Sequence, residues 1–375
     1  MSEFKPVKVG IMGFKNGHVT GMFDAMRSNS TFEVVAVSCD AKTRELLKER
    51  YGDARLFDKY DVFDSDGEMV KKHPELELCV CGGTNAEHIK QFRLCAENGI
   101  NAIMMKVPTL NMSEYDEMLR LEKESGIKVS IELEMRWYAA VERIKEIIKG
   151  GTLGEVTAIN AYNYSHFPMW WNGWMNDPKE IYGGIVSLRK GDARYRGGAM
   201  TDHPHLFDLI RYITESEFES VYAEVAPNMR DAAVVEDMVY IVGRMKNGVI
   251  VSLDPSYANR EYEQSNLIYA KDRLSHYPKA VQVEMSVCGT KGGIISDLYN
   301  PNTTEQLRFE DYAYRVNPRF YDISGTRKLY MEEFARAIRN GTEYKPEVSL
   351  AEHKKTMQVI NACYESISAG KAVTL

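Results

Sequence analysis

Short apolar runs alternate with amphipathic stretches through the first third of the chain. The runs VKVGIM, EVVAVS, LELCVC, NAIMM and KVSIEL are typical of β-strands. Helical patterns lie between them, at about residues 18–28, 42–50, 86–98 and 113–125. Strands and helices that alternate with such short connections form a parallel, doubly wound sheet. A sheet of this kind binds ligands beyond the carboxyl ends of its strands.

After a predicted helix at about residues 138–149 the pattern changes. Longer runs rich in Val, Ile and Tyr follow, reading EVTAINAYNY, FESVYAEVA, DMVYIVGRM, GVIVSLDPSYA and VQVEMSVCG. Asn247-Gly248 between two of them predicts a hairpin turn, which favours antiparallel pairing. Helices at about 203–213, 325–340 and 349–369 are expected to cover one face of this sheet.

The sequence therefore predicts an α/β protein of two packed domains. The first, over residues 1–128, is a Rossmann domain with a doubly wound parallel sheet that binds NAD(P). The second, over residues 129–375, is an α+β domain for substrate binding and oligomerisation. It carries a large, mostly antiparallel, open-faced sheet, and its C-terminal helices pack back.

Composition excludes several classes of protein. The 375 residues carry a net charge of −7 and show no basic face that nucleic acid would require. No run approaches the roughly 18 apolar residues of a membrane span, and the N-terminal residues lack an apolar signal segment. The six cysteines are scattered, which fits a reducing compartment, and Cys79 and Cys81 are expected to pack in the core. We expect a cytoplasmic protein that binds neither nucleic acid nor a membrane.

The loop after the first strand departs from the dinucleotide-binding pattern G-x-G-x-x-G. Gly13 stands where the tight turn requires glycine, but Lys15 and His18 occupy the other two glycine positions, and Gly17 lies one place early. The next helix is expected to offer unpaired N–H groups to a pyrophosphate, and Lys15 its charge. Asp40 ends the second strand, where an acidic side chain accepts from the adenosine ribose. An ordinary turn without a ligand is the alternative.

Several further motifs carry a resemblance to a known family. From CGGTNAEH through GINAIMMKVP to GGAMTDHPHLFDLIRYI, and again at CGTKGGI and SLAEHKKTMQVINACYESISAGKAVTL, the chain resembles the glucose–fructose oxidoreductase and inositol dehydrogenase family over its full length. The resemblance implies a Rossmann domain, an open-faced α/β domain and NAD- or NADP-dependent chemistry on a sugar-like alcohol. Together with the loop, it implies a cofactor site of Gly13, Lys15, Asn16, Gly17, His18, Asp40, Thr84, Asn85, His88 and Lys106.

Two motifs differ from the family pattern. Where the family has Glu-Lys-Pro, this chain has Met105-Lys106-Val107, so the lysine is kept and the carboxylate is lost. The family's Asp-x-Gly-x-His is shortened here to Asp202-His203-Pro204-His205. Either histidine can therefore occupy the catalytic position. We prefer His205, because the residues after it keep the family's spacing to Asp208.

Oxidising a carbinol requires a hydride acceptor and a base for the hydroxyl proton. Lys106, just past a strand end, is predicted to exchange that proton or to hold the substrate oxygen. Asp202 and His205 are expected on one face of a helix whose first turn carries Pro204, so that the carboxylate orients the imidazole. A surface lysine, a helix cap and a core histidine are the structural alternatives. We expect Lys106 and His205 to bracket the substrate hydroxyl from different domains.

The cluster of Asp202, His203, His205 and Asp208 also has the residue types of a metal site. No further ligand can be placed from the sequence, and the family generally works without metal, so no metal is expected.

The segment SHFPMWWNGWMND gathers three of the four tryptophans, Trp170, Trp171 and Trp174. An aromatic-rich loop of this kind suits a ligand with apolar faces and hydroxyl edges, such as a sugar or an aryl glycoside. A subunit interface and plain core packing are the alternatives. We also assign His203 and Arg136 to substrate binding.

These features predict an oxidoreductase that transfers a hydride between a nicotinamide cofactor and a secondary hydroxyl of a sugar, glycoside or cyclic polyol. NAD is favoured over NADP, because Asp40 would repel a 2′-phosphate, and a homo-oligomer is expected. One alternative is redox-neutral, NAD-dependent cleavage of a glycoside through a keto-sugar. The other is a non-catalytic, cofactor-binding sensor, which Lys106, Asp202 and His205 disfavour.

Overall fold

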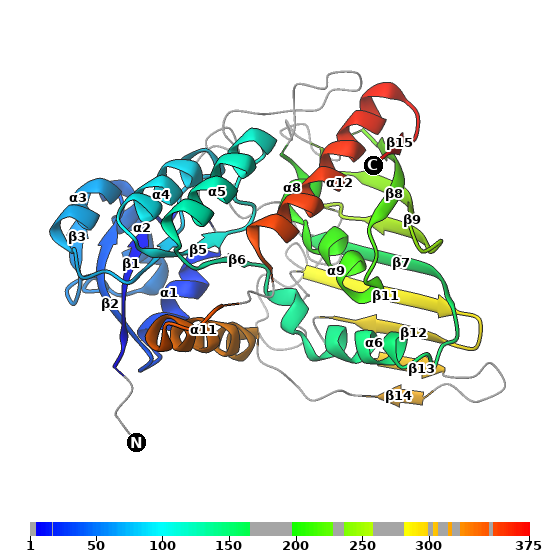
Figure 1. The fold of residues 1–375 in the computed structure, drawn as a ribbon, viewed down its shortest axis with the longest axis horizontal. Coiled ribbons are helices and arrows are strands. Elements are labelled where there is room, and N and C mark those ends of the chain that lie inside the picture. The colour runs from blue at the N-terminus through cyan, green and yellow to red at the C-terminus, as the bar shows by residue number, and fades with distance from the viewer. Residues whose placement is uncertain are drawn as a thin grey trace, which may run out of the picture. The chain divides into compact units, whose positions relative to one another are not determined.

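The computed structural model describes residues 5–16, 18–165, 197–227, 236–257, 281–298, 303–306, 314–316, 323–344 and 348–375. Two compact units make up the chain. Of the described residues, the first unit contains those up to 134 and those from 323 to 354, and the second contains the others. Figure 1 labels the helices and strands, and α12 (Leu350–Ala369) begins in the first unit and continues in the second.

The first unit is built on six parallel strands in the order β3-β2-β1-β4-β5-β6. They are β1 (Val7–Met12), β2 (Phe32–Ser38), β3 (Asp61–Phe63), β4 (Leu78–Cys81), β5 (Asn101–Met105) and β6 (Val129–Glu132). This order confirms the predicted Rossmann sheet. Its strand order reverses between β1 and β4, and ligands of such sheets bind at the carboxyl ends of the strands at that point.

Helices connect these strands, and most of them begin at a residue that caps the first turn. They are α1 (Val19–Arg27), α2 (Ala41–Tyr51), α3 (Asp66–Lys72), α4 (Asn85–Glu97) and α5 (Met112–Ser125). The same unit contains α11 (Ile323–Asn340), which connects none of these strands. Asp40, Ser65 and Asn111 each accept a backbone N–H of the helix that follows. Helix α11, far along the chain, contacts α1 and β1 (Figure 1).

In the first unit, the sequence patterns missed β3 and α3. Strand β3 has only three residues, and none of them is buried, so no apolar run marks it. Helix α3 has seven residues, which is too few for a periodic apolar pattern to be recognised. Its start does carry a signal, because Ser65 caps the helix by accepting the Glu68 N–H.

The second unit is built on nine strands in the order β14-β13-β12-β11-β7-β10-β9-β8-β15. They are β7 (Val156–Ser165), β8 (Phe218–Val225), β9 (Val239–Met245), β10 (Ile250–Asp254), β11 (Val281–Gly289), β12 (Gly293–Asp297), β13 (Thr303–Gln306), β14 (Tyr314–Val316) and β15 (Val373–Thr374). Among the described strands of this second sheet, only β7 and β10 pair in parallel. The predicted, mostly antiparallel sheet is therefore confirmed.

Helices cover one face of this second sheet. Helix α6 (Ala139–Lys149) contacts α9 (His205–Thr214) and β12, and α9 contacts β7 (Figure 1). Several large apolar side chains on the strands of this sheet are instead exposed, by 38 to 53%: Tyr222, Tyr240, Val242 and Ile295. These strands alternate buried and exposed positions, as expected for a sheet with one open face.

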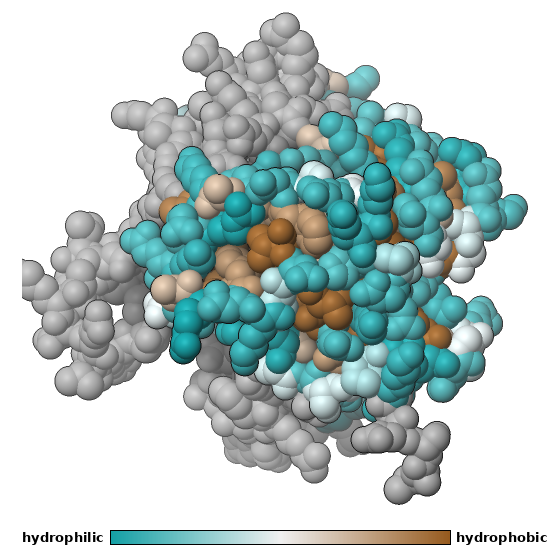
Figure 2. All heavy atoms as spheres, turned by 90° about the vertical axis from the view of Figure 1, so that its left-hand side faces the viewer, coloured by the Kyte–Doolittle hydropathy of each residue, from teal (hydrophilic) through white to brown (hydrophobic). Residues whose placement is uncertain are grey.

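The face of the molecule drawn in Figure 2 is mostly hydrophilic among its described residues, and its hydrophobic residues form small, separate areas. Of the described helices, none is both long enough and apolar enough to span a bilayer.

The predicted hairpin turn joins β9 to β10. The Met245 N–H donates to the Val249 carbonyl and the Gly248 N–H to the Met245 carbonyl, each at 2.8 Å. Gly248 has a φ of +91°, a conformation that L residues with a side chain rarely adopt.

We therefore expect Gly248→Ala to lower the free energy of unfolding by about 1–2 kcal/mol, the cost of a left-handed conformation for a residue with a Cβ atom. Denaturant titration followed by circular dichroism measures the change. Gly67→Ala is the matched control, because Gly67 lies in α3 at ordinary φ and nothing lies within 4 Å of an added Cβ. The control should leave stability unchanged or raise it, and equal losses in the two variants would contradict the expectation.

Candidate functional site

The turn between β1 and α1 lies against the loop between β4 and α4. Gly13 has a φ of +75°, and a Cβ on it would lie 3.2 Å from the Cα of Gly83. A Cβ on Gly82 would lie 2.4 Å from a Val19 methyl carbon. Gly13 and Gly82 are therefore required, because the turn after β1 and the loop after β4 approach each other closely.

Protein acceptors already receive the N–H groups at this turn. The N–H groups of Lys15 and Asn16 donate to the Gly82 carbonyl, at 3.0 and 3.1 Å. The His18 N–H donates to Asn16 Oδ1 at 3.0 Å, and the Val19 N–H donates to the Asn16 carbonyl at 3.2 Å. The helix start was expected to offer unpaired N–H groups to a pyrophosphate. That expectation is wrong for His18 and Val19, which stand at the start of α1.

Two charged side chains at this edge retain exposure. Lys15 Nζ lies 2.8 Å from Glu87 Oε1, and the Lys15 side chain is 27% exposed. Asp40, at the end of β2, is exposed and accepts from Thr43 N and Oγ1, at 2.8 and 2.9 Å. Burial alone would raise the pKa of Asp40, but these hydrogen bonds and the charge of Lys15 together lower it. Asp40 is therefore an ionised hydrogen-bond acceptor at the position where the sequence predicted an acidic side chain for the adenosine ribose. Gly17 lies outside the described residues.

Buried side chains hold the segment after β5 that carries Lys106. Asn16 Nδ2 donates to the Lys106 carbonyl at 3.0 Å, and Asn85 Nδ2 donates to the Val107 carbonyl at 2.7 Å. His88 Nδ1 lies 3.2 Å from the Val107 carbonyl and 3.1 Å from that of Pro108. Burial lowers the pKa of His88 to about 4, so its neutral ring donates through Nδ1.

Asn85 and His88 thus position the Lys106 segment from the protein interior, since they are 4% and 0% exposed. Thr84 begins α4 in a reciprocal cap with Glu87, whose side chain accepts the Thr84 N–H at 2.7 Å. Lys106 itself is 6% exposed.

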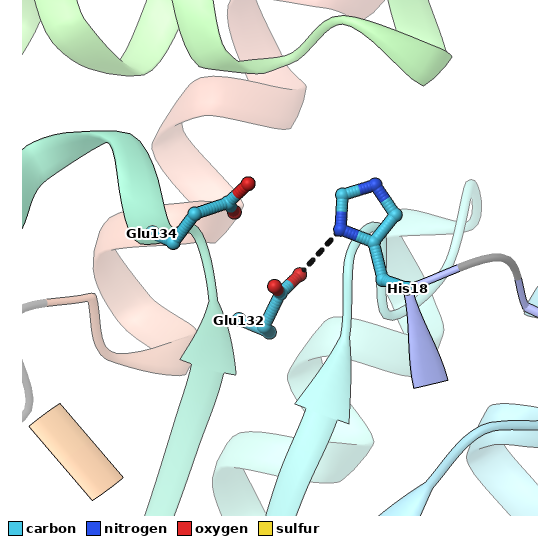
Figure 3. A group of neighbouring side chains, drawn as sticks. All are labelled: His18, Glu132 and Glu134. Atoms are coloured by element: carbon cyan, nitrogen blue, oxygen red, sulfur yellow. Dashed lines mark ion pairs between the residues drawn. The ribbon is translucent and has the colours of Figure 1, made fainter. Parts of the chain in front are cut away.

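A second cluster at this edge was not predicted from the sequence. Glu132 ends β6, Glu134 begins the 3-10 helix η1 (Glu134–Trp137), and His18 precedes α1. Figure 3 shows the three side chains turned toward one another. His18 Nδ1 lies 2.9 Å from Glu132 Oε2, and one ligand atom of each residue lies within 4.8 Å of those of the other two.

Both glutamates of this cluster are buried, with Glu132 0% and Glu134 2% exposed. Two ionised carboxylates within 4.8 Å of each other repel by about 3 kcal/mol or more at the effective permittivity of protein sites. The sequence does contain a signal, because glutamates two residues apart at the end of an apolar strand point to the same side.

In the second unit, the shortened motif interrupts a helix. Helix α8 (Ala199–Asp202) ends at Asp202, His203 has φ −112° and ψ 52°, and Pro204 precedes the first residue of α9, His205. The expectation that Asp202 and His205 share one helix face is wrong. The reason is steric, because the residue before a proline is disfavoured in the helical conformation.

His203, rather than His205, lies beside the Asp202 carboxylate. His203 Nε2 is 3.9 Å from Asp202 Oδ2, and Tyr257 Oη donates to the same oxygen at 3.0 Å. His203 Nδ1 lies 2.6 Å from the Pro255 carbonyl, so the neutral ring carries its proton on Nδ1 and its lone pair on Nε2. No sequence signal pointed to Tyr257, which stands 55 positions from Asp202. His203 and His205 are 6% and 3% exposed.

Arg136, predicted to bind substrate, forms a buried ion pair. Its Nε and Nη2 lie 2.7 and 2.6 Å from the two oxygens of Asp208, and its guanidinium lies 4.7 Å from the ring centre of Tyr212. Removing one partner of such a pair lowers the free energy of unfolding by about 3–5 kcal/mol, because a buried charge is left uncompensated. Both oxygens of Asp208 are therefore occupied by Arg136. Among the described residues, the arrangement that resembles a set of metal ligands is that of His18, Glu132 and Glu134. The tryptophans Trp170, Trp171 and Trp174 lie outside the described residues.

A buried carboxylate fixes the start of α8. Glu236 accepts from the N–H groups of Gly198 and Met200, at 3.1 and 3.3 Å, and from Tyr364 Oη at 2.7 Å. A Cβ on Gly198 would lie 2.3 Å from the Glu236 carbonyl oxygen, so the glycine is required. Burial raises the pKa of Glu236 to about 7, against these hydrogen bonds, which lower it.

The raised pKa predicts a pH dependence of stability. The folded state holds the Glu236 proton up to about pH 7, whereas the unfolded state releases it near its model value of 4.5. The contribution of Glu236 to the free energy of unfolding is therefore fully present below pH 4.5 and is lost as pH rises through 7. The loss amounts to at most about 3 kcal/mol. Glu236→Gln should remove this slope. Unfolding titrations of both proteins at pH 5 and 7.5 test it, and parallel losses in the two would contradict it.

Comparison with known proteins supplies the class. Residues 145–375 match the family described as "Oxidoreductase family, C-terminal alpha/beta domain". This match spans more than half of the chain, and the chain therefore belongs to the glucose–fructose oxidoreductase and inositol dehydrogenase family.

One relative is the myo-inositol 2-dehydrogenase of Thermotoga maritima, which is 23% identical over 336 residues that cover 88% of this chain and 86% of the relative. Two solved structures share the fold. An oxidoreductase from Agrobacterium radiobacter, in complex with NAD+, L-tartaric acid and magnesium, superposes with a TM-score of 0.74 at 16% identity, covering 98% of each chain. A putative NADPH-dependent oxidoreductase from Desulfitobacterium hafniense superposes with a TM-score of 0.75 at 17% identity, covering 99% of this chain and 98% of the other.

Proposed function

We propose that this oxidoreductase transfers a hydride between NAD and a secondary hydroxyl of a sugar or cyclic polyol. The observation that carries the proposal is the group of Asp202, His203 and Tyr257, in which a carboxylate lies beside an imidazole whose Nε2 carries the lone pair. The inositol dehydrogenase among the relatives supports the substrate class. The structural neighbours include one with NAD+ and one described as NADPH-dependent, and Asp40 favours NAD.

The residues of the first unit fit a dinucleotide. The close approach of Gly13 and Gly82 leaves no room for a Cβ and brings backbone to the strand ends where such ligands bind. Lys15 offers a cation for the pyrophosphate in place of the turn's N–H groups, and the ionised Asp40 offers acceptors for ribose hydroxyls. The backbone carbonyl of Lys106 is held by Asn16, and the proposal assigns the Lys106 side chain to the nicotinamide end of the cofactor.

Bound nicotinamide supplies the hydride acceptor or donor for the reaction. During oxidation the carbinol carbon loses a hydride and its oxygen loses a proton, and the proposal assigns that proton to His203 Nε2. Asp202 stabilises the imidazolium that forms, and the Tyr257 hydroxyl holds the Asp202 carboxylate in place. Lys106, as an ammonium, holds the substrate oxygen. His205 was the histidine preferred from the sequence, and the proximity of Asp202 favours His203 instead.

The direct test is incubation of the purified protein with NAD and panels of cyclic polyols, aldoses and aryl glycosides, with absorbance at 340 nm as the measurement. Formation of NADH with a polyol or aldose supports the proposal. Release of aglycone without net NADH would assign redox-neutral glycoside cleavage, and NAD binding without turnover on any panel would assign a sensor.

Replacing the proton-transfer groups should lower turnover. A positioned acid or base contributes about 10²–10⁴-fold, so Lys106→Met and His203→Ala should each lower kcat by that order while NAD affinity is retained. Tyr257→Phe should lower kcat less and shift the acidic limb of the pH–rate profile. Steady-state kinetics with the substrate found above measures these changes. If His205→Ala abolishes turnover and His203→Ala does not, the assignment of His203 is wrong.

Asp40 should set the choice between NAD and NADP. Its carboxylate would repel the adenosine 2′-phosphate, so Asp40→Ser should weaken NAD binding and strengthen NADP binding, moving the ratio of the two Kd values by at least about tenfold, or 1.4 kcal/mol. Fluorescence titration with each cofactor measures the ratio. Asp53→Ser is a suitable control, since Asp53 is an exposed aspartate after α2. Wild-type protein that binds NADP more tightly than NAD would refute the assignment.

A further inference from the structure

We propose that His18, Glu132 and Glu134 form a binding site for one divalent transition-metal cation. The three residues come from separate segments: the start of α1, the end of β6 and the start of η1. One ligand atom of each lies within 4.8 Å of the others, a spacing at which a single ion can contact all three. Figure 3 shows the carboxylates and the ring directed toward a common space.

Charge and burial support the proposal. Glu132 and Glu134 are 0% and 2% exposed, so water screens their mutual repulsion poorly. A divalent cation carries the charge that balances two carboxylates, and the His18 imidazole would add a nitrogen ligand. Ligands on a metal must be deprotonated, so the proposed donor set is two carboxylates and one neutral imidazole.

Local structure directs the His18 ring toward this space. His18 stands at the N-cap position of α1, yet its side chain makes no capping hydrogen bond to the helix. Its backbone N–H is instead fixed by Asn16 Oδ1, and its Nδ1 lies 2.9 Å from Glu132 Oε2. Asn16 also binds the Lys106 carbonyl, so the same side chain orients the histidine ligand and the Lys106 segment.

The donor set identifies the class of cation. One imidazole nitrogen and two carboxylate oxygens are typical of Mn²⁺, Fe²⁺ and Zn²⁺, whereas Mg²⁺ and Ca²⁺ prefer oxygen ligands throughout. Three protein ligands also leave coordination positions open, as in sites that bind water or a substrate oxygen. The proposal does not rest on the proposed reaction, because binding can be measured without cofactor or substrate.

The test uses the full chain, freed of metal with a chelator and then titrated with Mn²⁺ or Zn²⁺ by calorimetry. We expect one Mn²⁺ per chain and a rise in Tm on binding. Glu132→Gln and Glu134→Gln should each weaken the Kd by at least about tenfold, since even residues that only orient metal ligands have effects of 10–100-fold. In electron spin echo spectra of bound Mn²⁺, His18→Ala should remove the nitrogen coupling of the imidazole.

Glu75→Gln is the matched control. His73 also lies between two carboxylates, with Nδ1 3.1 Å from Glu75 and Nε2 3.2 Å from Asp61. These carboxylates flank opposite nitrogens, so one ion cannot contact all three residues, and the variant should bind Mn²⁺ as the wild type does. Absence of stoichiometric Mn²⁺ and Zn²⁺ binding would overturn the proposal. Unchanged metal affinity in Glu134→Gln would also overturn it. A third contrary outcome is a Tm that rises in Glu134→Gln while metal leaves the Tm of the wild type unchanged, because that result would indicate that Glu132 and Glu134 share a proton.

Discussion

Buried carboxylates at the ends of strands and helices need nearby donors, because an ionised group taken out of water is costly unless hydrogen bonds or charges compensate it. In the first unit, the half-buried Asp66 accepts from Ser38 Oγ and from Gln91 Nε2, the latter at 2.9 Å. Gln91 also donates to the Met12 carbonyl and accepts the Gly83 N–H, so one network joins the ends of β1, β2 and β4. The hydrogen bonds that satisfy this one carboxylate therefore also fix the loops at the carboxyl ends of β1 and β4.

The glycine-poor turn after β1 follows the same logic with different groups. In a glycine-rich turn the backbone N–H groups face the phosphates, and the ligand supplies the acceptors. Here Gly82 and Asn16 supply the acceptors, so the turn is complete within the protein. The charge at this edge is instead carried by the side chain of Lys15, which lies beside Glu87. If this edge binds a dinucleotide as proposed above, a side-chain cation takes the part that backbone N–H groups take in a glycine-rich turn.

Apolar periodicity predicted the kinds of both sheets and their longer strands, but not the short strands β3, β13, β14 and β15, nor β12, nor the contacts that join distant segments. Strand β1 matches its predicted run VKVGIM residue for residue, because apolar alternation is a local property. Asn85 and His88 were assigned to the cofactor, but their side chains hold the carbonyls after Lys106, which spacing along the chain does not reveal. Tyr257 lies in the run GVIVSLDPSYA, which predicted only a strand, because only the fold brings this side chain to Asp202.

The shortened motif shows how one missing position can change which of two histidines lies beside a carboxylate. With Pro204 in the sequence, the residue before it leaves the helical region, and α8 stops at Asp202. His203 then turns back beside Asp202 and the Pro255 carbonyl, while His205 begins the next helix. Glu236 fixes the other end of α8 through the N–H groups of Gly198 and Met200, so the break cannot be absorbed by a shift of this short helix. Conserving the order of residue types in a motif is therefore not enough to conserve which atom meets the carboxylate, because the backbone conformation between them decides it.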